Sequence, residues 1–357
     1  MKKIIKLNTK DRYCSIEIES DSIIQKLNVI ISKNKKTIFL IDKKVFYIFK
    51  KIHNYKDQAY FCINCSEKIK SFDHYSNLTQ KILNKNIDRN SVLVSIGGGT
   101  LGDLSGFIAS TILRGINLIL VPTTLLSQVD SSIGGKNGIN TSKGKNLVGS
   151  FYQPNRVLID PIFLKTLSKR EIRSGYAEIV KHGIINDSKF FDWLDNNSSE
   201  IIKLKPKKVI EAIYKSILIK RKYVLKDEKE NRDTKYSRAI LNFGHTFGHA
   251  LETFYNYNKK LTHGEAISIG MSIASMLSFK LKYLSEINLI KINNHFKKNK
   301  LPTSDKMMYN SKIFEIIKKD KKNIDERINF ILIKKLGMAF VSKKMNIKLI
   351  RSALIKS

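Results

Sequence analysis

The 357-residue sequence has few cysteines and prolines and no long apolar run. Three cysteines, Cys14, Cys62 and Cys65, are too few for a disulfide scaffold and fit a reducing cytoplasm. A transmembrane helix needs about 18 consecutive apolar residues, and no such run occurs. The basic residues near position 1 precede no apolar signal-peptide core, so we expect mature sequence there. These absences predict a cytoplasmic protein that does not enter a membrane.

Acidic residues are also scarce, with 31 Asp and Glu against 65 Lys and Arg, which gives a net charge of +34. Such a charge can indicate nucleic-acid binding, but the lysines are interleaved with Asn and Ile throughout the chain, and no nucleic-acid-binding motif is present. Our hypothesis is that drift towards A/T-only codons enriched the surface in lysine. A polyanion-binding protein stays an alternative, and the charge attracts anionic metabolites in either case.

Apolar runs alternate with amphipathic stretches in the first half of the chain. Strands are predicted at 37–41, 91–96 and 116–121, and a helix at 21–31. Nearly continuous apolar strands separated by helices are typical of a parallel sheet covered on both faces. We therefore expect an α/β domain with a Rossmann-like parallel sheet over residues 1–168.

The second half changes character near Asp160-Pro161, where proline disfavours helix at the preceding residue. Helical periodicity then predicts helices at 198–226, 264–283 and 285–298, and a single late strand at 328–333. We expect a second, mainly α-helical domain over residues 169–357.

A glycine-rich loop follows the second predicted strand and precedes a predicted helix at 104–113. It runs Gly97-Gly98-Gly99-Thr100-Leu101-Gly102-Asp103. Glycines let the backbone approach an anion, and a helix N-terminus offers free N–H groups. The spacing matches the dinucleotide fingerprint, although this strand is not the first and no acidic residue follows about 20 positions later. A purely steric turn is the alternative; the strand-to-helix context favours phosphate binding.

Further polar residues sit among turn residues after apolar segments. They are Thr123, Thr124, Asp130, Lys136, Lys145 and Asn146. Hydroxyl and ammonium groups suit phosphate and ribose oxygens. We expect one polar site built from loops at the strand ends.

Three of the seven histidines, His245, His249 and His263, lie close together beside glycines. His245 and His249 are four residues apart and share one face of a helix. Neutral imidazole suits Zn²⁺, and two histidines with a distant carboxylate would make a catalytic zinc site. The pattern lacks the glutamate of HExxH, so ordinary surface or core histidines stay an alternative. The isolated Cys62–Cys65 pair could be redox-active or half a zinc site, but no second pair exists.

Taken together, these motifs resemble the 3-dehydroquinate synthase family. The matching segments are residues 97–103, 121–132 and 144–146, Ala177-Glu178-x-x-Lys181, residues 242–249, and His263-Gly264-Glu265-Ala266. They follow the family order from about residue 40 to 325, and the segment from Pro122 to Ser132 is especially specific.

The resemblance implies a phosphate-eliminating lyase of the shikimate pathway, which leads to chorismate and the aromatic amino acids. Such an enzyme converts 3-deoxy-D-arabino-heptulosonate 7-phosphate to 3-dehydroquinate and phosphate. Transient oxidation by NAD, phosphate elimination, reduction, ring opening and an intramolecular aldol closure make up the reaction. The implied cofactors are NAD and Zn²⁺ or Co²⁺, with an NAD-binding first domain, a metal- and substrate-binding second domain, and a homodimer. No specific nucleic-acid partner is implied.

The resemblance also assigns residues to each part of the site. The implied metal ligands are Glu178, His245 and His263. The implied NAD residues are Asp42, Glu67, Lys70, Gly99, Thr100, Leu101, Gly102, Asp103, Thr123, Thr124, Lys136, Lys145, Phe163, Leu164, Lys165 and Thr166. The implied substrate and catalytic residues are Arg114, Asp130, Lys136, Asn146, Lys181, Lys220, Arg238, Asn242 and His249, with Lys321 or Lys322. Arg238 is also a candidate to act across a dimer.

One departure from the family pattern lies at the edge of the implied NAD site. Cys65-Ser66 replaces the usual Asp-Gly before Glu67 and Lys70, and we expect a modest weakening of NAD binding. The alternatives are another sugar phosphate cyclase with the same cofactors, a metal-dependent polyol dehydrogenase that releases NADH, or a decayed enzyme, against which the intact motifs argue.

Overall fold

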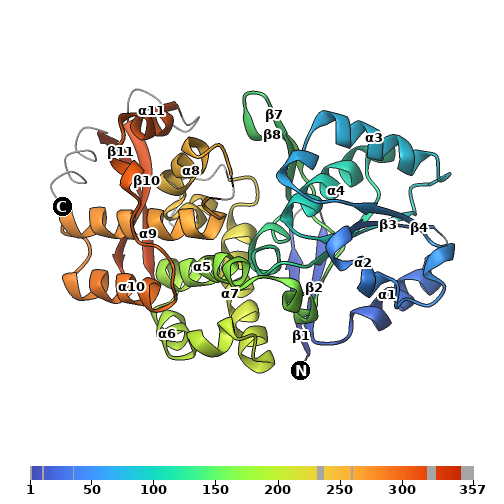
Figure 1. The fold of residues 1–357 in the computed structure, drawn as a ribbon, viewed down its shortest axis with the longest axis horizontal. Coiled ribbons are helices and arrows are strands. Elements are labelled where there is room, and N and C mark those ends of the chain that lie inside the picture. Colours follow the sequence, from blue (N-terminus) through green and yellow to red (C-terminus); the bar gives the residue numbers. More distant parts are fainter. Residues whose placement is uncertain are drawn as a thin grey trace. The chain divides into compact units, whose positions relative to one another are not determined.

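The computed structural model describes residues 2–9, 12–34, 36–230, 237–258, 260–319 and 327–346. The chain folds into two compact units (Figure 1). Unit 1 contains Met1–Ser168 and Leu204–Arg221, and unit 2 contains Lys169–Lys203 and Lys222–Ser357. The segment Leu204–Arg221 thus belongs with the first unit, whereas the sequence predicts it in the second domain. That NAD binds the first domain and the metal the second stays a prediction.

Unit 1 is built on a seven-stranded sheet in the order β1-β2-β9-β6-β5-β3-β4. The strands are β1 (Lys2–Asn8), β2 (Tyr13–Glu19), β3 (Thr37–Asp42), β4 (Ala59–Ile63), β5 (Val92–Gly97), β6 (Asn117–Pro122) and β9 (Arg156–Ile159). Only β1 is antiparallel to its neighbour. The α/β prediction is confirmed, and the three predicted strands are the adjacent parallel strands β3, β5 and β6.

Helices cover both faces of this sheet, which explains why its central strands are apolar throughout. In Figure 1, β3 and β4 lie between α1 (Ile23–Lys33) and α2 (Phe46–Phe49) on one side and α3 (Phe72–Leu83) and α4 (Gly99–Thr111) on the other. Phe39 and Val94 pack in the core on the α1 side. On the opposite face, Ser105 of α4 donates a hydrogen bond to Ser95 of β5 (2.9 Å).

The polar segment after β6 forms a hairpin, whereas the sequence predicts loops at strand ends there. Its strands, β7 (Lys136–Thr141) and β8 (Gly144–Phe151), are antiparallel, with Lys136 opposite Phe151. Lys136, Lys145 and Asn146 therefore lie on strands, so the loop prediction is wrong for them. Alternating polar and small residues gave no apolar pattern from which the hairpin could be recognised.

Unit 2 is mainly helical. Its helices are α5 (Lys169–Asn186), α6 (Ser188–Ile202), α8 (His245–Phe254), α9 (His263–Lys280), α10 (Glu286–Lys298) and α11 (Ser311–Lys319), with β10 (Arg327–Lys335) and β11 (Met338–Asn346) as an antiparallel pair. The predicted helices at 264–283 and 285–298 match α9 and α10, and the late strand at 328–333 lies within β10.

The single helix predicted at 198–226 is wrong, because α6 ends at Ile202 and α7 (Pro206–Lys226) begins four residues later. Leu204 has a left-handed backbone with φ 58°. Pro206 starts α7 because proline is favoured in the first turn of a helix and disfavoured inside one. Among the described residues, no helix combines the length and apolar composition that a membrane span requires.

Candidate active site

The glycine loop joins β5 to α4 as the sequence predicts. Gly98 precedes the first residue of α4 and supplies no side-chain cap, which leaves the first N–H groups of the helix available to an anion. A Cβ on Gly99 would lie 2.7 Å from Ser131 Oγ, and one on Gly98 would lie 3.2 Å from Thr124 Cγ2. Thr123 N donates to Gly97 O (2.9 Å). A small cavity adjoins this loop, lined by Ser95, Gly97, Gly98, Gly99, Gly102, Leu120, Val121, Pro122, Ser127, Ser131 and Ser132.

Lys70 connects three of the predicted nucleotide- and substrate-binding segments. Its buried ammonium donates to Asp103 Oδ2 (2.6 Å) and also hydrogen-bonds Asn146 Oδ1. Burial raises the pKa of Asp103 to about 6, against the opposing effect of Lys70. Glu67 lies beside this pair and contacts Thr100 Oγ1 (3.5 Å) and Lys145 Nζ (3.6 Å). The structure therefore gathers predicted residues from three separate segments into one polar cluster.

Asp42 ends β3, where its carboxylate accepts a hydrogen bond from Lys44 N (3.0 Å). Cys62 and Cys65 on the neighbouring segment are free thiols. Burial raises the pKa of both, and for Cys65 the adjacent Asp42 carboxylate raises it further. A thiol with a raised pKa has little thiolate at neutral pH, which disfavours redox chemistry at this pair.

Several predicted nucleotide residues have buried side chains. Leu101, Phe163 and Leu164 are fully buried, and Phe163 packs in the core beside Phe39. Thr166 Oγ1 donates to Phe163 O (2.7 Å) within the 3-10 helix Pro161–Thr166 that also carries Lys165. The three apolar side chains belong to the interior of unit 1, so only their backbone could offer groups to a ligand, whereas the Lys165 side chain is exposed.

Two further predicted substrate residues of unit 1 occupy unusual backbone. Asp130 lies in a π-helical turn, Ser127–Ser131, and its carboxylate and carbonyl oxygens both accept from Lys220 Nζ of α7. Arg114 is exposed between Leu113 and Gly115, and all three have positive φ, of 64°, 50° and 122° respectively. Such strain in residues other than glycine is typical of functional turns.

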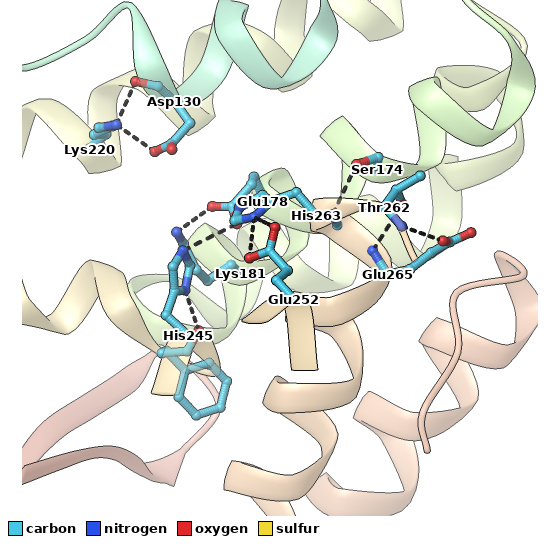
Figure 2. Close-up of polar contacts among 12 residues, drawn as sticks. Asp130, Ser174, Glu178, Lys181, Lys220, His245, Glu252, Thr262, His263 and Glu265 are labelled. Atoms are coloured by element: carbon cyan, nitrogen blue, oxygen red, sulfur yellow. Dashed lines mark hydrogen bonds and ion pairs between the residues drawn. The ribbon is translucent and has the colours of Figure 1, made fainter. Parts of the chain in front are cut away.

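In unit 2, three side chains that are distant in sequence converge on one point (Figure 2). Glu178 comes from α5, His245 begins α8 and His263 begins α9. Glu178 Oε1 lies 3.7 Å from His245 Nε2 and 3.6 Å from His263 Nε2. Two atoms bound to one tetrahedral zinc at about 2.1 Å lie about 3.4 Å apart, so the spacing fits a shared cation.

Glu178 needs positive charge nearby because its side chain is fully buried. Its Oε1 has no hydrogen-bond partner of ordinary geometry among the described residues. Lys181, one turn further along α5 and also buried, forms an ion pair with its other oxygen, Oε2. A buried carboxylate facing one ammonium and two imidazoles is the donor set that a divalent cation would complete.

Both imidazoles have the orientation of metal ligands. Carbonyl and carboxylate oxygens only accept hydrogen bonds, so the ring nitrogen facing them carries the proton. His245 Nδ1 faces Phe243 O (3.2 Å), and His263 Nδ1 faces Glu252 Oε2 (3.2 Å). Each Nε2 is therefore directed at Glu178, and a neutral ring offers its lone pair there.

Residues adjacent in sequence to His245 and His263 fix the positions of these two histidines. Gly244 has φ 79°, which turns the chain into α8 immediately before His245. Thr262 and Glu265 form a capping box around the start of α9, with Thr262 N donating to Glu265 Oε2 (2.8 Å). Gly264 N donates to Ser174 Oγ of α5 (2.9 Å), which brings His263 close to the helix that carries Glu178. These contacts appear in Figure 2.

The charges of the cluster shift the pKa values of its members. Burial opposes ionisation of Glu178, but Lys181 and His245 outweigh it and hold the pKa of that carboxyl well below its usual range. Burial and the nearby Lys181 ammonium lower the pKa of His245. Burial also acts to lower the pKa of His263, but the Glu252 and Glu178 carboxylates prevail and raise it to about 10.

The other predicted residues of unit 2 within the described part of the chain are Arg238, Asn242 and His249. Arg238 is buried, and its Nη1 donates to Glu228 O (2.6 Å) within the same unit. Asn242 Nδ2 donates to Glu230 Oε1 (2.8 Å). His249 is exposed, with its ring centroid 5.1 Å from that of His245. Lys321 and Lys322 lie outside the described residues.

Sequence reasoning missed Glu252 and Glu230. Glu252 lies seven residues after His245, two helical turns along the same face of α8, and that spacing could have indicated it. His249, Glu252 and His263 also form a second group whose ligand atoms lie within 4.8 Å of one another. Glu230 precedes Asn242 by 12 residues and gave no comparable signal.

Comparisons with known proteins agree on one family. The 3-dehydroquinate synthase N-terminal family matches residues 60–174, and the 3-dehydroquinate synthase C-terminal family matches residues 175–323. A 3-dehydroquinate synthase of Pelagibacter ubique is 41% identical and aligns over 99% of this chain and 98% of its own. One from Agrobacterium fabrum is 45% identical over 77% of this chain and 74% of its own.

Solved structures share the fold at lower identity. A 2-epi-5-epi-valiolone synthase from Streptomyces hygroscopicus with NAD⁺ and Zn²⁺ bound has a TM-score of 0.84 at 22% identity, covering 96% of this chain and 95% of its own. A 2-deoxy-scyllo-inosose synthase complexed with carbaglucose-6-phosphate, NAD⁺ and Co²⁺ also scores 0.84, at 23% identity over 99% and 100%. An iron-containing alcohol dehydrogenase from Corynebacterium glutamicum scores 0.64 at 14% identity, covering 88% of this chain and 89% of its own.

Proposed function

Because this chain belongs to the 3-dehydroquinate synthase family, we propose that Glu178, His245 and His263 hold the divalent metal on which its reaction depends. The enzyme is a phosphate-eliminating lyase of the shikimate pathway. It converts 3-deoxy-D-arabino-heptulosonate 7-phosphate to 3-dehydroquinate and phosphate. One observation carries the metal assignment: a buried carboxylate lies 3.6 and 3.7 Å from two imidazole Nε2 atoms whose Nδ1 atoms are held by other partners.

The proposed cofactors are NAD and Zn²⁺ or Co²⁺. When bound, NAD supplies reversible hydride transfer, and the metal supplies Lewis-acid polarisation of substrate oxygens. The free N–H groups after Gly98 support a diphosphate position there. Asp42, at the end of β3, would accept hydrogen bonds from a ribose. Glu67, Lys70 and Asp103 would support this part of the site.

The remaining proposed roles concern the substrate, which carries a phosphate and a carboxylate. Lysine, arginine and histidine side chains bind such groups through charge-assisted hydrogen bonds. We assign this role to Arg114, Lys136, Lys181, Lys220, Arg238 and His249, with Asp130, Asn146 and Asn242 orienting hydroxyl groups. Lys220 is held by Asp130 and Arg238 by Glu228 O, so these cations are already positioned before a substrate arrives.

The test of the activity is incubation of the purified chain with the heptulosonate phosphate, NAD⁺ and Zn²⁺. We expect phosphate release with no net change of absorbance at 340 nm, because the NADH formed is reoxidised within each turnover. Net NADH accumulation would instead identify a polyol dehydrogenase. Turnover of a different sugar phosphate, with none of the heptulosonate, would identify another cyclase.

The test of the metal assignment is His263→Ala. This substitution should abolish Zn²⁺ retention and turnover together, while circular dichroism shows that most of the fold remains. His53→Ala, in an exposed histidine of unit 1, is the matched control and should retain both. Full activity of the wild-type chain after exhaustive chelation would contradict the assignment.

We also propose a cytoplasmic homodimer. Three free cysteines support a reducing compartment, and the family resemblance supports the dimer. Light scattering coupled to size-exclusion chromatography should give twice the mass of the 41.0 kDa chain. A monomer that turns over at the full rate would contradict the dimer.

A further inference from the structure

Glu252 holds His263 from the side opposite Glu178. Its two carboxylate oxygens lie 3.2 and 3.3 Å from His263 Nδ1, and its side chain is largely buried. Because a carboxylate only accepts hydrogen bonds, Nδ1 keeps its proton when a cation binds, and Nε2 is the atom left to bind the cation. Nε2 is also the atom that lies 3.6 Å from Glu178.

The two histidines of the site differ in what holds them. His245 Nδ1 donates to a neutral backbone carbonyl, that of Phe243 (3.2 Å), in its own chain segment. His263 Nδ1 donates to a charged carboxylate that comes from a different helix, α8. A carboxylate partner makes an imidazole a stronger donor to a cation than a carbonyl partner does. Glu252 therefore sets both the orientation and the basicity of His263.

A cation has two candidate positions around His263. One is the group with Glu178 and His245, and the other is the group with His249 and Glu252. In the second group, Glu252 already contacts His263 Nδ1 with both oxygens, and His249 is exposed. In the first group, Oε1 of the fully buried Glu178 lies 3.7 and 3.6 Å from the Nε2 atoms of His245 and His263, while Lys181 pairs with Oε2. The contacts therefore favour the first group.

We propose that Glu252 is a positioning residue that fixes His263 Nε2 towards Glu178 and thereby directs the divalent cation to the Glu178 group. It touches neither the cation nor the substrate and acts only through His263. This inference rests on the proposed function, because it takes Glu178, His245 and His263 as the metal ligands.

The experiment measures the affinity of the full chain for Zn²⁺ by competition with a chromophoric chelator, after the metal has been removed. Glu252→Ala should weaken Zn²⁺ binding about 10–100-fold. Glu252→Gln keeps the volume and an accepting oxygen but loses the charge, so its loss should be smaller than that of Glu252→Ala. His249→Ala should leave Zn²⁺ affinity unchanged, since His249 belongs only to the second group.

Two further measurements distinguish a loss of His263 positioning from a general destabilisation of the fold. The unfolding temperature of the metal-free chain should be the same for Glu252→Gln and the wild type. The visible spectrum of bound Co²⁺ should keep its band position in both Glu252 variants, because the ligand set is unchanged. In Glu178→Ala, Zn²⁺ affinity and the Co²⁺ spectrum should both be lost.

The outcomes distinguish this inference from the metal site on which it rests. Normal Zn²⁺ affinity in Glu178→Ala would overturn the metal site itself. Loss of affinity in Glu178→Ala, with wild-type affinity in both Glu252 variants, would overturn only the role of Glu252. Loss of affinity in His249→Ala as large as that in Glu252→Ala would place the cation in the second group and overturn the inference.

Discussion

At the scale of single residues, His263 should make metal binding depend on pH. The pKa of this imidazole is raised to about 10, with Glu252 and Glu178 outweighing the effect of burial. Below that pH the metal-free ring is protonated, so a cation must displace a proton from Nε2. Zn²⁺ affinity should therefore rise about tenfold for each pH unit between about 7 and 9.

Calorimetry checks this prediction directly. Titration of Zn²⁺ into the metal-free chain at pH 7.5, in two buffers of different ionisation enthalpy, should reveal release of about one proton per metal bound. His245 contributes little, because its pKa is lowered by burial and by Lys181 and its ring is neutral at that pH. An observed enthalpy that is identical in both buffers would exclude a protonated His263.

Lys136 tests the substrate side of the site. Lys136→Ala should lower kcat at least about 100-fold while changing the Kd for NAD⁺ less than about threefold, because the residue is assigned to the reacting substrate more than to the nucleotide. Lys143→Ala, in the exposed turn of the same hairpin, is the control and should change neither quantity. Lost NAD⁺ affinity with normal turnover at saturation, measured by calorimetry and phosphate release, would reverse the assignment.

Single residues can be predicted from the sequence where a motif carries them, and their roles stay predictions. Glu178 and His263 are 85 positions apart, and only the resemblance linked them before the structure brought them together. Glu252 escaped notice because one glutamate on an amphipathic helix resembles any solvated carboxylate. Phe243 could not have been found at all, since its contribution is a backbone carbonyl.

At the scale of elements, the start of α9 controls the position of His263. Thr262→Ala removes the capping box and should lower the free energy of unfolding by about 1 kcal/mol. Because His263 is the first residue of this helix, Zn²⁺ affinity should fall as well, by several-fold. Chemical denaturation and chelator competition measure the two effects separately.

The N-terminus of α10 provides a matched control for that substitution. Ser285 caps α10 by accepting a hydrogen bond from Asn288 N, and Ser285→Ala should cost a similar free energy of unfolding. It should leave Zn²⁺ affinity unchanged, since α10 carries none of the proposed ligands. Equal losses of affinity in the two variants would show that destabilisation of unit 2, and not the cap of α9, governs metal binding.

Elements were predictable where their hydrophobic pattern was strong. The central strands β3, β5 and β6 are apolar runs buried on both faces, and they were predicted within about one residue. The helix break before Pro206 was missed because apolar periodicity continues on both sides of it. The hairpin β7–β8 was not predicted because many of its residues are polar or small and leave no apolar pattern. Some make polar contacts instead, such as that of Asn146 with Lys70.

At the scale of the whole molecule, the net charge of +34 should affect association with substrate. A strongly cationic protein attracts an anionic sugar phosphate, and salt screens that attraction. The value of kcat/KM should therefore fall several-fold between about 20 and 300 mM NaCl, while kcat changes little. A value of kcat/KM that is independent of salt would show that the cations act only locally.

Non-specific binding of polyanions is the second expected consequence of this charge. Measuring DNA binding over the same range of NaCl concentrations separates it from a nucleic-acid function. A weak complex with DNA that disappears at moderate salt is the expected result. A tight complex with a preferred sequence, surviving at that salt, would revive the polyanion-binding alternative.

The path of the chain through its two units limits how the protein can be divided. The chain forms α5 and α6 of unit 2 and then returns to unit 1 with the segment Leu204–Arg221. A gene fragment ending at codon 168 would thus encode a sheet without Lys220, leaving the Asp130 carboxylate without its ammonium partner. We therefore expect that neither half is a transferable module and that a split version of this enzyme would have to be cut elsewhere.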